Sequence, residues 1–395
     1  MAQTPDIVIL SAVRTAIGDF GGALRGHPPT KLGALVAAEA IRRAGVAPDA
    51  IEHAVFGTVL HTEPADMYLA RVAAIGAGVP VATPALTVNR LCGSGLQAIV
   101  SAAQMVALGE ARTALAGGAE CMSRAGHLLS SARWGQKMGE ATATDMLLGA
   151  LNDPFGNGHM GITAENVAAR HGIGREAQDR FAAESHRRAA RAIAEGRFRD
   201  QILPVEVADR RSTRVFDTDE HVRADVDEAL LASLRPAFRR DGSVTAGNAS
   251  GINDGAAALV LMAGEEAAQR GLKPMARIVA WGHAGVDPGV MGIGPVPATR
   301  CALDRARLSV ADLDVVESNE AFAAQACAVS AELGLAADKV NPNGGAIALG
   351  HPVGASGAII ATKLVHELQR TGGRYGLATM CIGGGQGIAL IVERL

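Results

Sequence analysis

The chain has 395 residues, of which 48% are hydrophobic and 19% charged, and its formal net charge is −3. This size and apolar content exclude an intrinsically disordered chain and predict two or three packed units. The small net charge gives no electrostatic basis for binding nucleic acid, and no run of the sequence approaches the roughly 20 apolar residues that span a membrane. Since the first apolar stretch, residues 7–10, is only as long as a strand, we expect no signal peptide.

Along the first third of the chain, apolar stretches with helical and with strand-like spacing alternate. The spacing predicts helices over residues 32–43 and 96–108, and strands over residues 53–59 and 113–116. Alternating strands and helices are typical of mostly parallel sheets with helices on their faces. The sequence therefore predicts an α/β fold.

A weak internal repeat relates the two ends of the chain at an offset of 262 residues. Residues 40–57 resemble residues 302–319, and Ser94-Gly95 fall on Ser356-Gly357 at the same offset. Such self-similarity predicts two related halves. We assign residues 1–121 with 253–273 to the first half and residues 274–395 to the second.

Residues 122–252 remain unmatched and are predicted to form an inserted domain. Their Arg-rich stretch, residues 174–199, has the pattern of one amphipathic helix. Its arginines fit either of two interpretations. They form a solvated helix face, or the helix caps the active site and its cations meet an anionic ligand.

The cysteines are Cys92, Cys121, Cys301, Cys327 and Cys381. They are odd in number and widely spaced, and no pair has the spacing of metal ligands. This pattern favours a reducing, cytoplasmic compartment, in which a special cysteine is catalytic rather than bridging.

Cys92 stands in a Gly-rich turn, Cys-Gly-Ser-Gly, between an apolar strand and the helix over residues 96–108. A thiol at a helix N-terminus lies in the positive end of the helix dipole, which favours the thiolate. The glycines would let backbone amides approach a developing oxyanion. The alternative is a small buried cysteine of the core.

Two further reactive side chains lie at Gly-rich turns near the C-terminus. His351 is held between Gly350 and Pro352 before a predicted helix over residues 354–368, where it would serve as a general base or as a structural hydrogen-bonding group. Cys381 ends a strand and is followed by Ile382 and a run of glycines. This run is not a phosphate loop, because no Gly-x-x-x-x-Gly-Lys-Ser/Thr occurs and only eight residues follow position 387. The two thiols, Cys92 and Cys381, together with His351 therefore suggest covalent catalysis with proton shuttling.

Asn319 follows the predicted second-half strand, within Glu-Ser-Asn-Glu-Ala-Phe. Its amide would hold a water or a carbonyl group. The alternative is that Asn319 is the N-cap of a helix.

Together these segments resemble the thiolase family over essentially the whole chain. The matching stretches are NRLCGSGLQA, GGAECMS, HMGITAEN, VTAGNASGINDGAAA, MGIGPVPA, ESNEAFAAQAC, NPNGGAIALGHPVGASG and CIGGGQGIA. Several of these stretches, with HTEPADMYLARVAA and DTDEHVR, are similar to those of bacterial β-ketothiolases of relaxed short-chain specificity, which supply polyhydroxyalkanoate precursors. The resemblance implies two pseudo-symmetric halves of mixed sheets layered with helices, plus an inserted loop domain that covers CoA.

The implied activity is that of an acetyl-CoA C-acyltransferase in fatty acid metabolism. It condenses acetyl-CoA with a short acyl-CoA, reversibly, through an acyl-cysteine. Cys92 would carry the acyl group, His351 would take its proton, and Cys381 would exchange the α-proton of acetyl-CoA. His351 with a water on Asn319 would stabilise the enolate, and the backbone amides of Cys92 and Gly383 would form the second oxyanion hole.

The resemblance also implies the binding residues and the assembly. CoA, a substrate and product rather than a resident cofactor, would contact His159, Met160, Arg223, Phe238, Ala246, Ser250 and Phe322. Met291 would lie at the acyl pocket, and no metal is expected. A cytoplasmic homotetramer, a dimer of dimers, is expected, with residues 126–144 as a tetramer-forming loop. Ser318 and Val353 depart from the family, in which Ala and Ile are common at these positions.

Two alternatives stand beside this interpretation. A ketoacyl synthase or hydroxymethylglutaryl-CoA synthase would carry a second His or a Glu in place of Cys381. A non-catalytic lipid carrier on the same fold would have lost one of the three reactive side chains. The sequence keeps all three and therefore favours the thiolase.

Overall fold

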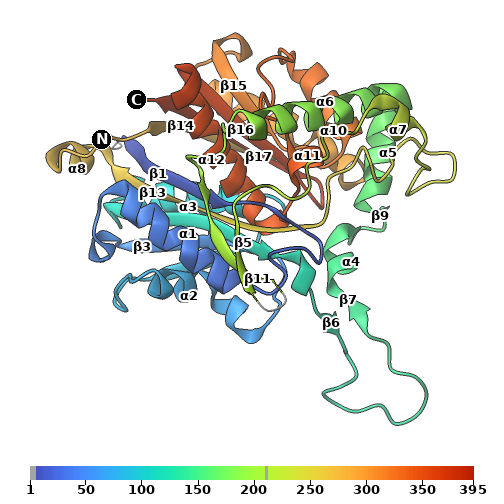
Figure 1. Ribbon diagram of the computed structural model, residues 1–395, viewed down its shortest axis with the longest axis horizontal. Coiled ribbons are helices and arrows are strands. Elements are labelled where there is room, and N and C mark those ends of the chain that lie inside the picture. The colour runs from blue at the N-terminus through green and yellow to red at the C-terminus, as the bar shows by residue number, and fades with distance from the viewer. Residues whose placement is uncertain (1–5, 210–211) are drawn as a thin grey trace.

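The computed structural model describes residues 6–209 and 212–395 of the chain, and one mixed sheet runs through the molecule (Figure 1). The main strands of this sheet, in spatial order, are β15 (Leu313–Ser318), β16 (Tyr375–Ile382), β17 (Gln386–Arg394), β14 (Ala276–Gly285), β1 (Ile7–Thr15), β13 (Asn253–Ala263), β5 (Thr113–Cys121), β3 (His53–Gly57) and β4 (Ala85–Val88). Two short strands, β2 (Gly18–Asp19) and β10 (Ile202–Leu203), pair with β13 and β1.

The helices of the two halves are α1 (Pro29–Ala44), α2 (Leu69–Gly76), α3 (Ser94–Ala107), α8 (Gly264–Gln269), α9 (Pro295–Ala306), α10 (Ala323–Leu333), α11 (Ala346–Leu349) and α12 (Val353–Thr371). The intervening segment contains α4 (Met146–Leu151), α5 (Met160–His171), α6 (Arg175–Ala194) and α7 (Glu228–Ala232), with the short strand pairs β6 (His127–Leu128) and β7 (Thr144–Asp145), β8 (Asn152–Asp153) and β9 (Gly158–His159), and β11 (Val205–Asp209) and β12 (Ser212–Phe216). Short 3₁₀ turns lie at Pro48–Ala50, Pro64–Tyr68, Met122–Arg124, Pro288–Ile293 and Val310–Asp312.

The same strand order occurs on both sides of the sheet. On one side β3 pairs parallel with β5 and β5 antiparallel with β13, and on the other β15 pairs parallel with β16 and β16 antiparallel with β17. The two sides join where β1 pairs antiparallel with β14. The expectation of mostly parallel sheets is wrong, because β17 returns from β16 as a hairpin. Gly384 and Gly385 both have positive φ in its turn, which glycine adopts without strain.

Small residues let the helices lie close against the sheet. A Cβ built at Gly118 of β5 would lie 2.4 Å from the carbonyl oxygen of Gly354 in α12, whereas Ala119 is near Gly33 of α1. Adjacent strand residues point to opposite faces, so α12 and α1 cover opposite faces of β5. The helices α3 and α12 cross at their own glycines, since a Cβ at Gly357 would lie 2.1 Å from the amide nitrogen of Leu96.

Helices α4 and α5 of the intervening segment lie to one side of the sheet, and the β6–β7 loop extends away from the rest of the molecule (Figure 1). Trp134 and Met138 in this loop are 87% and 88% exposed. Helix α6 ends at Ala194, before the predicted end at residue 199, because Gly196 takes the left-handed conformation that terminates helices. Within the described ranges, no helix combines the length and the apolar character needed to cross a bilayer.

Candidate active site

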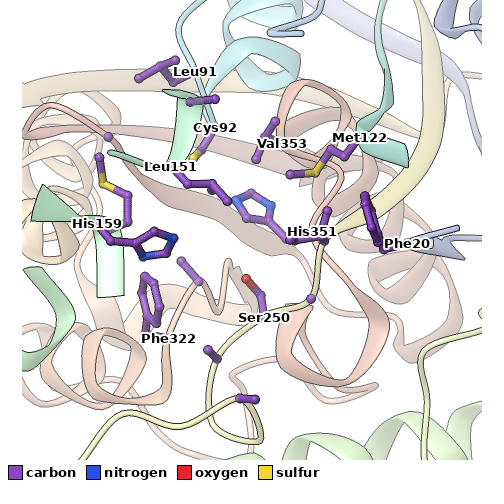
Figure 2. A pocket seen from close by; sticks show the side chains of 18 of the residues that line it. Phe20, Leu91, Cys92, Met122, Leu151, His159, Ser250, Phe322, His351 and Val353 are labelled. Atoms are coloured by element: carbon purple, nitrogen blue, oxygen red, sulfur yellow. The ribbon is translucent and has the colours of Figure 1, made fainter. Parts of the chain in front are cut away.

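A cavity of about 550 Å³ is lined by residues of the N-terminal half, the C-terminal half and the intervening segment (Figure 2). Its lining includes Cys92, His351, Cys381 and Gly383. Every expected CoA contact also lines it, and so does the expected acyl-pocket residue: these are His159, Met160, Arg223, Phe238, Ala246, Ser250, Phe322 and Met291. Residues more than 280 positions apart in the sequence are therefore brought into one site.

The loop that carries Cys92 is tightly fixed. Leu91 has a φ of 45°, which is uncommon for a residue with a side chain and is typical of a constrained functional turn. The Leu91 N–H donates to the Asn89 side chain at 2.9 Å. The Ser94 hydroxyl accepts from the Arg90 N–H at 2.8 Å and donates to the Leu91 carbonyl at 2.6 Å. These bonds orient the thiol just before α3 begins at Ser94.

The Cys92 thiol is protonated at rest. Burial raises its pKa above the ordinary range, while hydrogen bonds from the N–H groups of Gly383 and of Cys92 itself lower it by a smaller amount. The expectation that the helix terminus favours the thiolate is therefore wrong for the resting thiol, because desolvation is the larger effect. A base is needed to take the proton. The two N–H groups are the pair expected to hold an oxyanion.

The side chain of His351 is held by Ser356. The Ser356 hydroxyl donates to the Pro352 carbonyl at 2.9 Å, so its oxygen accepts from His351 Nδ1 at 2.6 Å. His351 Nε2 is therefore unprotonated, and it is buried with no hydrogen-bond partner among the described residues. Burial lowers the pKa of His351 to about 4. The ring is thus a neutral base with one free nitrogen.

The turn before His351 requires glycine. Gly350 has a φ of 108°, and a Cβ there would lie 2.5 Å from the side-chain carbon of Asn253. That Asn253 amide accepts the His351 N–H at 2.9 Å and donates to the Gly18 carbonyl at 3.1 Å. Asn253 therefore joins the turn of the base to the N-terminal part of the sheet.

Cys381 is the second thiol of the cavity and ends β16. Burial raises its pKa strongly, and negative charge on nearby Cys92 raises it further. Cys381 is therefore a thiol at rest, able to donate a proton. The following Gly383 lies against Met160, whose Cε would be 3.2 Å from a Cβ at that position.

Asn319 lies behind the main cavity rather than among its lining residues. Its N–H donates to the Thr379 carbonyl at 2.9 Å, and its Nδ2 is buried without a partner among the described residues. With Ser318 and Ser356 it lines a separate space of about 20 Å³. The N-cap alternative is wrong, because α10 begins at Ala323 with Phe322 as its N-cap residue.

An aromatic wall forms another part of the cavity. The rings of His159 and Phe238 are stacked, with centroids 4.8 Å apart, and Phe322 meets Phe238 edge-on at 6.2 Å. Phe238 lies directly over Gly161, where no side chain would fit. His159 Nδ1 accepts the Gly161 N–H at 3.0 Å, which leaves its Nε2 as the protonated nitrogen. The wall therefore offers an apolar surface with one polar donor.

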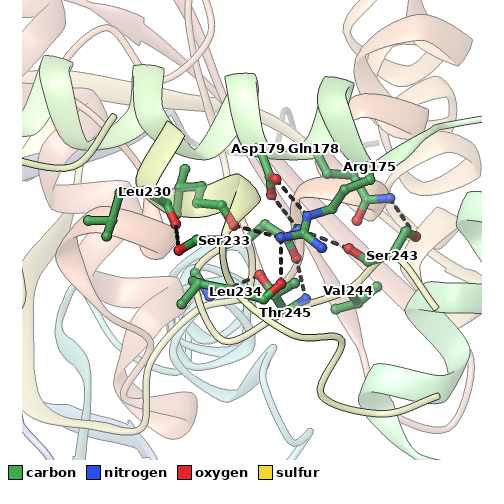
Figure 3. Close-up of polar contacts among 12 residues, drawn as sticks. Arg175, Gln178, Asp179, Leu230, Ser233, Leu234, Ser243, Val244 and Thr245 are labelled. Carbon is green, nitrogen blue, oxygen red and sulfur yellow. Dashed lines mark hydrogen bonds and ion pairs between the residues drawn. The ribbon is translucent and has the colours of Figure 1, made fainter. Parts of the chain in front are cut away.

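Polar contacts join helix α6 to the segments around Leu234 and Ser243, which lie on either side of Phe238 in the sequence (Figure 3). Arg175 pairs with Asp179 at 2.6 Å and donates to the carbonyls of Leu231 and Leu234, which fixes the segment that carries Phe238. No α6 arginine lines the cavity, so the cavity gives no support to the interpretation that these cations meet the ligand. Arg223, from a loop beyond β12, does line the cavity and has no ion-pair partner in the described part of the chain.

Two sets of functional residues were missed in the sequence. Glu120 is fully buried and accepts the N–H groups of Val59, Leu60 and Gly354 at 3.0, 3.1 and 2.8 Å. It thereby ties the N-terminus of α12 to the other half, and a charged residue inside an apolar strand is a signal that would have found it. The second set is an apolar wall made by Val59, Met122, Leu151, Ile252 and Val353, for which the sequence offers no local signal.

Comparisons with known proteins match this chain to one protein family over essentially its full length. The patterns described as "Thiolase, N-terminal domain" and "Thiolase, C-terminal domain" match residues 7–265 and 272–394. The chain is 61% identical over 394 residues to "Beta-ketothiolase BktB" of Cupriavidus necator, with 100% of both chains covered. It is 53% identical to "Acetyl-CoA acetyltransferase" of Chromobacterium violaceum, over 98% of this chain and 100% of the relative.

Solved structures agree with the fold. The acetyl-CoA acetyltransferase of Bacillus anthracis superposes with a TM-score of 0.97 at 47% identity, covering 100% of both chains. Human mitochondrial 3-ketoacyl-CoA thiolase in complex with CoA gives a TM-score of 0.97 at 43% identity, over 100% of this chain and 99% of that one. The predicted α/β class, with two related mixed-sheet halves and an insertion, is confirmed.

Proposed function

Because the chain belongs to the thiolase family, we propose that it joins acetyl-CoA to a short acyl-CoA, giving a 3-ketoacyl-CoA and free CoA, and runs the same reaction in reverse. The observation that carries this proposal is that one cavity holds two thiols and a neutral imidazole whose Nε2 is free. The condensing-enzyme and lipid-carrier alternatives are not favoured, because the full-length relatives are named as β-ketothiolase and acetyl-CoA acetyltransferases.

Cleavage begins at Cys92. His351 Nε2 takes the thiol proton, and the thiolate attacks the 3-keto carbon of the substrate. The N–H groups of Cys92 and Gly383, which lower the pKa of this thiol, would bind the resulting oxyanion. The bond between C2 and C3 then breaks. Its electrons form the enolate of acetyl-CoA, and the acyl group stays on Cys92.

The Cys381 thiol protonates the enolate at its α-carbon, and acetyl-CoA leaves. Its raised pKa keeps it protonated until that step. His351 passes the Cys92 proton to the Cys381 thiolate and then takes the proton of free CoA, whose thiolate attacks the acyl-Cys92 thioester. His351 returns its proton to Cys92, so the cycle closes with all protons accounted for. Condensation is the reverse sequence. In this account a water on Asn319 joins His351 in stabilising the enolate.

The remaining residues that line the cavity are suited to bind CoA. The apolar pantetheine chain would run along the wall formed by His159, Phe238 and Phe322, with Met160, Ala246 and Ser250 beside it. Arg223 would neutralise a phosphate, since it lines the cavity and is exposed. The chemistry needs no resident metal or redox group, because each step moves only protons and acyl groups.

Self-association as a homotetramer is part of the proposal. Strand β4 ends the sheet, and an edge strand offers unpaired backbone groups to a second copy. Exposed apolar side chains gather in the same part of the chain, namely Met67, Tyr68, Val72, Ile75, Val81 and Leu86. The β6–β7 loop would join two such dimers. A cytoplasmic location is proposed as well, since the described cysteines are all free.

The test is thiolysis of acetoacetyl-CoA by added CoA, followed through the loss of its enolate absorbance. The unmodified enzyme should consume the substrate, and Cys92→Ser should not, because an alcohol of far higher pKa replaces the thiol. Consumption at an unchanged rate in Cys92→Ser would refute the assigned role of Cys92. No consumption by the unmodified enzyme would refute the function.

A further inference from the structure

The cavity wall is made by two separate apolar clusters, and each cluster holds one of the two thiols. Cys381 packs with Met160, Met291 and Phe322. Cys92 packs against the main core and against a second cluster, whose buried members are Leu60, Met122, Leu147 and Val353 and whose partly buried members include Val59, Leu151 and Ile252. The clusters share no residue. The space beside each thiol is thus bounded by a different set of side chains.

We infer that these clusters select different parts of the substrate, an inference that rests on the proposed function. The cluster around Cys92 takes the straight tail of the acyl group, and Met122 and Val353 set its length. Met291, beside Cys381, limits substitution at the α-carbon. Chain length and α-branching are therefore controlled by different residues of one site.

The chemistry of the two thiols leads to this division. The acyl carbonyl carbon is bonded to the Cys92 sulfur, so the tail begins at that atom and must pass among the side chains packed around it. The α-carbon of acetyl-CoA exchanges its proton with Cys381, so a methyl group on that carbon meets the Cys381 cluster. Apolar walls favour each methylene that they accept by about 0.8 kcal/mol, which is roughly a fourfold effect.

The position of Met122 makes it the closing residue of the tail space. It is 1% exposed and stands in the 3₁₀ turn directly after β5, where the next N–H, that of Ser123, donates to Asp254 at 2.9 Å. Figure 2 shows Met122 and Val353 on one side of Cys92 and His159 on the other, with Phe20 beyond Met122. Phe20 lines the same cavity and is 57% exposed, so the wall behind Met122 is thin.

Two features fit a pocket for short tails rather than for acetyl groups alone. An unbranched methionine side chain changes rotamer readily and can yield to a few carbons. Val353 lines the cavity with a short β-branched side chain, which leaves more room beside Cys92 than a longer aliphatic side chain would. The substrate class that follows is straight-chain 3-ketoacyl-CoAs with tails of a few carbons.

The experiment compares kcat/KM for thiolysis of 3-ketobutyryl-, 3-ketohexanoyl-, 3-ketooctanoyl- and 2-methyl-3-ketobutyryl-CoA. Met122→Ala should raise the ratio of kcat/KM for 3-ketooctanoyl-CoA to that for 3-ketobutyryl-CoA by roughly 16-fold, which is the effect of two more accommodated methylenes at about fourfold each. Val353→Ile should lower the ratio of the hexanoyl to the butyryl substrate. Met291→Ala should raise the ratio of kcat/KM for 2-methyl-3-ketobutyryl-CoA to that for 3-ketobutyryl-CoA. It should change the ratios among the straight-chain substrates by no more than about twofold. Met105→Ala, on the far end of α3, is the matched control and should change no ratio.

The outcomes separate the inference from the proposed function. If the unmodified enzyme does not cleave 3-ketobutyryl-CoA, the function itself fails. If it does, and Met291→Ala rather than Met122→Ala changes the straight-chain ratio, the division between the clusters is overturned. Val353→Ile adds bulk instead of removing it, so it still tests the role of the cluster beside Cys92 if Met122→Ala does not fold. An unchanged hexanoyl ratio in Val353→Ile then overturns the inference.

Discussion

His351, the proposed base, depends on the hydroxyl group of Ser356, which holds its Nδ1 and leaves its Nε2 without a partner among the described residues. In Ser356→Ala the ring can turn or adopt the other tautomer. We expect kcat for acetoacetyl-CoA thiolysis to fall by roughly 10²-fold, within the range that a positioned base contributes. KM should change much less, because Ser356 lies outside the CoA wall.

The pH profile of kcat/KM distinguishes the loss of the Ser356 hydroxyl group from a general loss of structure. The pKa of His351 is lowered to about 4, so the neutral ring is retained as the pH falls and charges only near that value. The acid limb of kcat/KM for the unmodified enzyme should therefore lie well below pH 6.5, the ordinary range of histidine. Ser101→Ala, on the neighbouring helix α3, should keep both the rate and the profile. A Ser356→Ala enzyme with the unmodified rate would contradict the role of the hydroxyl.

Glu120 is a second single residue on which the site depends. Its carboxylate accepts three backbone N–H groups, and a glutamine offers one oxygen and turns its NH₂ toward the others. We expect Glu120→Gln to lower the free energy of unfolding by about 2 kcal/mol, the cost of leaving buried groups unpaired. Urea unfolding measures this loss. The exposed Glu110→Gln is its control, and equal stability of the two variants would argue against the account.

The reactive side chains were predictable from the sequence, because Cys92, His351 and Cys381 each stand at a Gly-rich turn that ends a strand or begins a helix. The pKa of Cys92 was not predictable, since it depends on burial by residues from distant segments. Met122 carries no local signal, because a methionine after a strand has the same pattern in any core.

At the scale of secondary structure, the crossing of α3 and α12 joins the turn that carries Cys92 to the turn that carries His351. A Cβ at Gly357 would lie 2.1 Å from the backbone nitrogen of Leu96, which cannot move independently of α3. We expect Gly357→Ala to cost about 1–3 kcal/mol of stability, as overpacking does, and to lower kcat by separating the two turns. Gly149→Ala in α4 is the control, because no atom lies within 4 Å of its Cβ. Equal denaturant midpoints for the two variants would contradict the crossing.

Helices and strands were predicted where local pattern decides them. Helices α1, α3 and α12 lie within a few residues of the predicted ranges. The sheet direction was not predictable from alternation alone, because the hairpin between β16 and β17 depends on two glycines with positive φ. The division of the chain at residues 121, 252 and 273 stays a prediction.

At the scale of the whole molecule, the β6–β7 loop is the segment most suited to bind other subunits. Trp134 and Met138 are almost fully exposed, and large apolar side chains in that state favour burial by a partner. We expect the double variant Trp134→Ser/Met138→Ser to sediment as a dimer where the unmodified enzyme sediments as a tetramer. Val215→Ser, which removes another exposed apolar side chain, should remain tetrameric. A tetrameric double variant would exclude the loop from assembly.

The central claim is that the two thiols of one cavity have different roles, with Cys92 carrying the acyl group and Cys381 moving the proton. Acylation does not need the second thiol, so Cys381→Ala incubated with acetyl-CoA should accumulate acetyl-enzyme. Peptide mass spectrometry of that protein tests the claim most directly. We expect the acetyl group on Cys92 and its absence from the double variant Cys92→Ser/Cys381→Ala. An acetyl group on Cys121, Cys301 or Cys327, or none on Cys92, would contradict it.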